Sequence, residues 1–185
     1  RVHRGQLDEA QQSARILAEL AVSADVQEQG QLHLAEATLL LGAGRHADAL
    51  HSAERAVVIR EALGISADGV KEAVVVALEA ALALDDVARV EELLAMVDAL
   101  PPGNSPLFLR AQSVRFAARL AARREGPEEV APLFARATDQ FRALGYPFPL
   151  ATCLLEHGEW LLSCGRPDEA APLLDEAATT FERLG

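Results

Sequence analysis

The feature that most constrains the fold of this chain is a sequence segment that occurs in it more than once. Residues 44–64 read GRHADALHSAERAVVIREALG, and residues 165–185 read GRPDEAAPLLDEAATTFERLG. Five stretches share a turn followed five residues later by a small apolar residue, and they start 39, 41, 40 and 40 residues apart, at Gly5, Gly44, Asp85, Glu125 and Gly165. Such a period predicts a repeat protein in which each unit buries its apolar side chains only against its neighbours.

The composition favours helices as the repeating element. Half of the residues are hydrophobic but only 4% are aromatic, so Ala and Leu, which are strong helix formers, supply most of the apolar content. Three of the repeats close with a Leu-Gly pair whose glycine lies 20 residues after the turn, at Gly64, Gly145 and Gly185. Glycine tolerates the positive φ that ends a helix, and Pro127 and Pro167 stand where a second helix can begin.

These signals predict an all-α array of helix pairs. Nine helices are expected, at residues 6–22, 25–43, 46–63, 67–84, 87–100, 107–124, 127–144, 148–163 and 167–184. They belong to a single repeat domain over residues 1–185, with a half repeat at 5–24 and full repeats at 25–64, 65–105, 106–145 and 146–185. Because the chain opens without an initiator Met, we expect it to be a piece of a longer protein.

The last repeat carries a resemblance to a known family. Its small and apolar positions are Leu154, Gly158, Leu161, Gly165, Ala170, Leu174 and Ala177. This pattern is similar to the tetratricopeptide repeat, although His157 stands at a usual Leu, Leu161 stands at a usual aromatic residue, and the period exceeds the usual 34 residues. The resemblance implies a right-handed superhelix of antiparallel helix pairs whose first helices line a concave groove.

The long period and the Leu-Gly ending are also similar to the C-terminal helical arrays of large bacterial regulators. Those regulators combine an ATP-binding signalling domain with a LuxR-type DNA-binding domain or an adenylyl cyclase domain. The resemblance implies that this chain is the interaction or sensor segment of such a protein.

Charge and apolar run length exclude several kinds of partner. The net charge of −11 disfavours nucleic-acid binding by this fragment, because phosphate backbones are repelled. No apolar run approaches the roughly 18 residues needed to span a membrane. Cys153 and Cys164 lie about 16 Å apart on one predicted helix and so cannot pair with each other, which fits a reducing, cytoplasmic compartment.

No catalytic motif occurs in the sequence. Glycine-rich phosphate loops, GxSxG, HExxH and paired CxxC motifs are all missing, so we expect no enzymatic activity and no cofactor. His46 and His51 lack the carboxylate neighbours of a metal site. Trp160, the single Trp, is expected to pack between helices, with ligand stacking as the alternative.

A stripe of arginines is the strongest candidate for a binding site. Residues 101–124 contain five Arg and neither Asp nor Glu, and Arg115, Arg119 and Arg123 recur every four residues on one helix face. The tetratricopeptide resemblance places this face on the groove. Because the guanidinium fork matches a carboxylate, the stripe predicts capture of an acidic or C-terminal carboxylate group of a peptide partner.

An internal role for the same arginines stays open. Glu79 and Glu159 occupy the groove place equivalent to Arg119 in the neighbouring repeats, so adjacent first helices could instead be joined by Arg–Glu pairs. In the repeat at 25–64, Leu34, Thr38 and Leu41 would form an uncharged groove floor, suited to an amphipathic helix, to an extended peptide or to a preceding repeat.

The function expected from the sequence is therefore that of a protein-protein interaction or sensor module in a bacterial signalling or transcriptional regulator. It would bind a protein or peptide in its concave groove. Three alternatives remain. The chain could be a self-association module that forms homo-oligomers through its terminal repeats, or a regulatory domain that binds a small effector through Trp160 and the arginines. In the third, it belongs to an enzyme and carries a cryptic active site.

Overall fold

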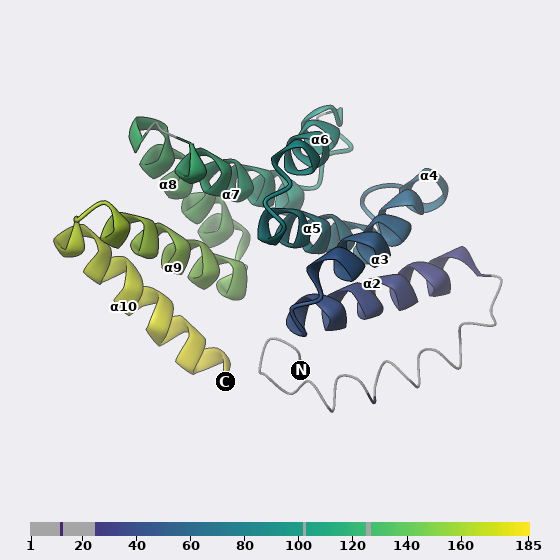
Figure 1. Cartoon of the computed structure of the whole chain (residues 1–185), viewed down its shortest axis with the longest axis horizontal. Helices are drawn as coiled ribbons and strands as arrows, with labels where there is room; N and C mark the ends of the chain where they lie inside the picture. Colours follow the sequence, from purple (N-terminus) through teal and green to yellow (C-terminus); the bar gives the residue numbers. More distant parts are fainter. Residues whose placement is uncertain (1–11, 13–24, 102, 125–126) are drawn as a thin grey trace. The chain divides into compact units, whose positions relative to one another are not determined.

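The computed structural model describes residue 12 and residues 25–101, 103–124 and 127–185. Within these residues the regular structure is helical and contains no strand, which confirms the all-α class. The helices are α2 (Val26–Gly42), α3 (His46–Val58), α4 (Arg60–Leu63), α5 (Asp68–Ala83), α6 (Val87–Asp98), α7 (Leu107–Arg123), α8 (Pro127–Leu144), α9 (Pro147–Ser163) and α10 (Pro167–Leu184) (Figure 1). The half repeat predicted at 5–24 lies, apart from residue 12, outside the described residues, so the count of nine helices stays a prediction.

Most helix bounds lie within two residues of those expected from the sequence, and one helix differs in kind. The helix predicted at 46–63 is interrupted at Ile59, where α3 ends and the short helix α4 begins. Ile59 keeps helical dihedral angles, with φ −62° and ψ −15°, and the guanidinium of Arg60 donates a hydrogen bond to the carbonyl of Val57. The backbone therefore stays in the helical region at Ile59, although the helix is interrupted there.

Three tight turns that the structure describes share one backbone conformation at equivalent positions. Gly44 between α2 and α3 has φ +73°, and Gly165 between α9 and α10 has φ +72°. In the turn between α5 and α6 the same place is taken by Asp85, whose φ of +58° is the single positive value at a non-glycine residue in the described part of the chain. The repeated left-handed residue explains why glycine recurs at this offset in the sequence.

Two compact units make up the chain, residues 1–106 and residues 107–185. We refer to them as unit 1 and unit 2. The boundary falls one residue beyond the end of the predicted repeat at 65–105. The units differ in composition, because all eight aromatic residues of the sequence lie in unit 2 and none in unit 1.

Small aliphatic side chains form the core of unit 1. Helix α3 packs against both α2 and α5, α2 also contacts α5, and α6 packs on α5. The fully buried residues of these helices are mostly alanine and valine, among them Ala37, Ala49, Ala53, Val74, Ala77 and Val90. Alanine at the contacts allows neighbouring helix backbones to approach closely, which permits dense packing without aromatic residues.

Unit 2 repeats this packing scheme around larger side chains. Helix α8 packs against both α7 and α9, α7 also contacts α9, and α10 packs on α9. Its core cluster consists of Ala111, Val114, Ala118, Val130, Phe134, Ala137, Phe141 and Cys153. Trp160 packs against this cluster, as the sequence led us to expect.

Helices α9 and α10 are held at close range by a glycine. A Cβ atom placed on Gly158 would lie 2.6 Å from Cδ2 of Leu174 and 2.7 Å from its Cγ, so no larger residue fits in the present arrangement. Leu174 therefore packs directly on the backbone of α9. Among the described helices, none is both long and apolar enough to cross a membrane.

Candidate functional site

Arg115 lies at the contact between α7 and α9 rather than on an open face. Its side chain is only 4% exposed. The guanidinium donates two hydrogen bonds to the carboxylate of Glu156 on α9, from Nε to Oε2 at 2.6 Å and from Nη2 to Oε1 at 2.5 Å. Its Nη1 donates to the side-chain oxygen of Gln112, at 3.1 Å. Arg115 thus forms the two-pronged carboxylate contact expected of an arginine, but with a carboxylate of its own chain.

Arg119 joins the same carboxylate from the next turn of α7. Its Nε lies 3.3 Å from Oε1 of Glu156, so two cations meet at one anion. The central carbons of the Arg115 and Arg119 guanidiniums also lie 4.9 and 5.1 Å from the ring centre of Phe116, which is fully buried. We call these five residues, Gln112, Arg115, Phe116, Arg119 and Glu156, the Arg–Glu cluster. Attraction between guanidinium groups and an aromatic ring adds to the ion pairing where water is excluded.

The other residues predicted for the groove are dispersed. Arg123 is exposed in the last turn of α7. Glu159 is exposed on α9, and the carboxylate at which the two arginines meet is Glu156, three residues before it. Glu79 is partly buried on α5 of unit 1. The described contacts therefore join Arg115 and Arg119 through a residue that the sequence analysis did not single out.

A signal for Glu156 was present in the sequence. Arg115 and Glu156 are 41 residues apart, one residue more than the 40-residue spacing of the two repeats that contain them. Residues one period apart occupy neighbouring positions on adjacent first helices, so an arginine with an acidic residue at this distance indicates a contact between repeats. The sequence analysis instead compared Arg119 with the residue 40 positions later, Glu159. That glutamate lies about one helical turn beyond Glu156 on α9.

Leu34 and Thr38 both lie partly buried on α2 in unit 1. The hydroxyl of Thr38 donates a hydrogen bond to the carbonyl of Leu34, at 2.8 Å. This bond satisfies the hydroxyl proton within the helix, so Thr38 presents its methyl group and an oxygen acceptor to its surroundings. The uncharged groove floor that these residues would form stays a prediction.

An aromatic cluster surrounds His157 on α9. The imidazole stacks on Phe134, with ring centres 5.1 Å apart and planes 13° from parallel, and lies 6.0 Å from the ring of Trp160. Its Nε2 is buried without a hydrogen-bond partner. Burial, and then the positive charge of Arg166, lower the pKa of His157 below its ordinary value. The neutral imidazole is therefore the form that this cluster accommodates.

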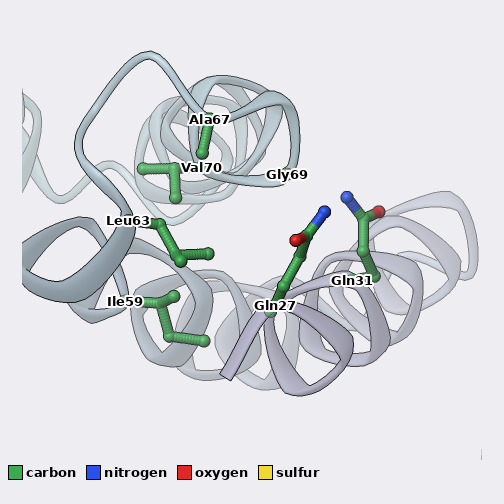
Figure 2. Close-up of a pocket in the computed structure, with 8 residues that line it drawn as sticks. Gln27, Gln31, Ile59, Leu63, Ala67, Gly69 and Val70 are labelled. Atoms are coloured by element: carbon green, nitrogen blue, oxygen red, sulfur yellow. The ribbon is translucent and has the colours of Figure 1, made fainter. Parts of the chain in front are cut away.

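A pocket of about 280 Å³ opens at one end of unit 1 (Figure 2). It lies where the beginning of α2, the α3–α4 junction and the beginning of α5 meet. The lining residues are Gln27, Gly30, Gln31, Ile59, Leu63, Ala67, Gly69 and Val70. In Figure 2 the two glutamine carboxamides lie close together, across from the apolar side chains of Leu63, Ile59 and Val70. The sequence analysis did not predict this pocket, which three separated segments assemble.

Across the described residues, no cluster of three or more His, Cys, Asp or Glu side chains is arranged to hold a metal ion. Cys153 is fully buried, and burial raises the pKa of its thiol to about 11. At neutral pH this thiol is therefore protonated and a poor nucleophile.

Comparison with known proteins identifies no family for the chain. No protein-family model matches the sequence, and no curated protein matches it significantly.

Proposed function

We propose that the chain is a helical repeat module of the tetratricopeptide type that binds a protein or peptide and has no catalytic activity of its own. The observation that carries this proposal is the packing scheme common to both units. A first helix contacts its second helix and also the next first helix, in α2, α3 and α5 and again in α7, α8 and α9. Side-by-side first helices are the arrangement from which repeat proteins build extended binding surfaces.

The proposed binding surface is the groove side of the first helices, in a right-handed superhelix. In unit 1 the uncharged face with Leu34 and Thr38 would contact apolar side chains of a partner. In unit 2, Arg119 and Arg123 would attract an acidic segment, because complementary charge speeds and orients association. Arg115 would serve this surface indirectly, since it is bound to Glu156 and positions α9 beside α7.

The setting that we propose is the cytoplasm of a bacterium, within a larger signalling or transcriptional regulator. This part of the proposal rests on the resemblance of the long repeat with its Leu-Gly ending to the helical arrays of such regulators. Binding in the groove would then be transmitted to the remainder of the regulator as a change in packing.

Site-specific photo-crosslinking tests the groove. A photoreactive residue would replace Glu79 or Glu159, which are predicted to face the groove, or Glu91 or Glu182, which lie on the second helices α6 and α10. Glu159, Glu91 and Glu182 are all exposed glutamates on helices, so Glu159 is matched to the two second-helix positions, whereas Glu79 is partly buried. After irradiation in cell extract, we expect a discrete adduct at the two groove positions only, and mass spectrometry of that adduct identifies the partner.

Two results would contradict a groove that binds another protein. Equal adducts at all four positions would show that capture is nonspecific. Adducts of twice the chain mass that contain only this chain would replace the proposal with self-association.

A further inference from the structure

The pocket in unit 1 has two chemically different walls. One wall is aliphatic and consists of Ile59, Leu63, Ala67 and Val70. Val70 is buried, whereas Leu63 is 41% exposed, so this wall runs from the core of the unit to the surface. A branched aliphatic side chain that entered the pocket would lose contact with water and gain dispersion contacts along the wall.

The opposite wall is polar and uncharged. Gln27 and Gln31 lie one turn apart on α2, and their carboxamides come together beside the first turn of α5 (Figure 2). Each carboxamide provides an oxygen acceptor and an NH₂ donor group, which is the pattern that a peptide bond complements. None of the eight lining residues is charged. A charged ligand group would therefore lose its hydration without gaining a counterion from the lining residues.

Two glycines help to shape these walls. A Cβ atom on Gly30 would lie 3.2 Å from Cδ1 of Ile59, so the glycine leaves room for that side chain against α2. A Cβ atom on Gly69 would lie 3.0 Å from Nε2 of Gln31, so the bare backbone of α5 lets the carboxamide lie across it. The positions of Ile59 and Gln31 thus depend on missing side chains opposite them.

We propose that this pocket binds an aliphatic residue flanked by uncharged peptide bonds. The aliphatic side chain contacts Ile59, Leu63 and Val70, and the flanking amides exchange hydrogen bonds with Gln27 and Gln31. The volume lies near the lower limit of small-ligand sites, which limits the occupant to about one residue. The proposal does not depend on the groove, because these lining residues are not those predicted for it.

The first test is titration of the ¹⁵N-labelled chain with N-acetyl-L-leucinamide, followed by NMR. We expect the side-chain amide signals of Gln27 and Gln31 and the backbone amide signal of Gly69 to shift along one binding curve. A Kd on the order of 1 mM is expected for so small a ligand. The control probe is the α-amide of N-acetyl-L-aspartic acid, which carries a side-chain carboxylate where the first probe carries an aliphatic group. It should bind at least tenfold more weakly, because burying an unpaired charge is costly.

Variants at two exposed glutamines and one buried glycine of the pocket separate binding from folding. Gln27→Ala combined with Gln31→Ala should weaken binding at least tenfold, because the hydrogen-bonding wall is lost while alanine maintains the helix. Gln29→Ala is the matched control, since this glutamine lies on the same helix and does not line the pocket. Gly69→Ala should also weaken binding while the chain stays folded, because its Cβ displaces only the flexible end of Gln31.

Three results would overturn the proposal. The first is the lack of a saturable shift in the amide signals of Gln27, Gln31 and Gly69. The others are equal binding by the double variant and the parent chain, and equal binding of the leucine and aspartate probes. A capped Ala-Leu-Ala peptide then distinguishes two sources of the same chemistry. Tighter binding than that of the single residue identifies a peptide segment as the occupant. Equal binding identifies a free residue-sized amide, and both results support the proposed ligand class.

Discussion

At the scale of single residues, the most important interaction in unit 2 is that of one carboxylate, on Glu156, with two guanidiniums, on Arg115 and Arg119. Glu156 is 16% exposed and Arg119 is 23% exposed, so the Arg–Glu cluster is largely shielded from solvent. In such a place the ions depend on one another, because a buried charge without its partner is far costlier than the pair itself.

Removing the Glu156 charge should therefore destabilise unit 2. For Glu156→Gln we expect the free energy of unfolding to fall by about 3 kcal/mol, since the buried guanidinium of Arg115 would lose the carboxylate that accepts two of its hydrogen bonds. Urea denaturation followed by circular dichroism measures this change. Glu159→Gln is the control, because it makes the same substitution at an exposed place on α9 and should change stability by less than about 0.5 kcal/mol. Equal effects of the two variants would show that the cluster contributes little.

His157 should make stability depend on pH. Its folded pKa lies below the unfolded value of about 6.5, so as the pH falls through that value the unfolded chain takes up a proton that the folded chain does not. Stability associated with the neutral imidazole is thus complete above the unfolded pKa and is lost as the pH falls toward the folded pKa. Arg166 opposes protonation and Glu169 favours it, in addition to the dominant effect of burial.

Comparison with His157→Leu isolates this contribution. Leucine retains apolar contact with Phe134 and carries no proton, so the difference in unfolding free energy between the variant and the parent chain should increase as the pH is lowered from 8 to 5, in favour of the variant. Denaturation series at several pH values measure it. If the unfolding free energies of the two proteins changed in parallel with pH, His157 would not be the cause of the pH dependence.

At the scale of elements, the distance between helices is determined by which side chains are missing. Gly158 on α9 lowers the stability of the helix by about 1 kcal/mol relative to alanine. Its missing side chain leaves space for Leu174 of α10 to pack against the helix backbone. We predict that Gly158→Ala lowers stability by about 1–3 kcal/mol, because the added methyl group overpacks this contact.

A double-mutant cycle shows whether the contact is the cause. In a Leu174→Ala background the clashing atoms are gone, so Gly158→Ala should become neutral or stabilising. Thermal unfolding of the four proteins provides the comparison. Additive effects of the two substitutions would indicate that Gly158 matters for a reason other than its contact with Leu174.

The elements also show how far the sequence predicts the structure. The left-handed glycines and the helix-starting prolines are local signals, and the period repeats them along the chain. Together they locate most helices to within two residues. The interruption at Ile59 escaped prediction because residues 46–63 contain no Gly or Pro that would mark it. The choice of Glu156 over Glu159 depends on the register between two helices, and the pocket depends on three segments meeting, so neither follows from local pattern.

At the scale of the whole molecule, the division into two units predicts separable folding. Each unit buries its own core, and the cluster around Phe134 and Phe141 lies entirely within unit 2. We therefore expect a fragment of residues 107–185 to fold by itself, with helical circular dichroism and a cooperative thermal transition. A fragment that stays unfolded under conditions where the full chain is folded would show that unit 2 requires unit 1.

The uneven distribution of aromatic residues has an optical consequence. Unit 1 contains neither Trp nor Tyr, whereas Trp160 of unit 2 lies against His157, with the Arg166 guanidinium 5.9 Å from its ring centre. Indole emission from the unlabelled protein therefore comes from unit 2 alone, and a charged imidazole beside the ring would quench it. Tryptophan fluorescence would therefore report the protonation of His157 and the unfolding of unit 2, without a contribution from unit 1.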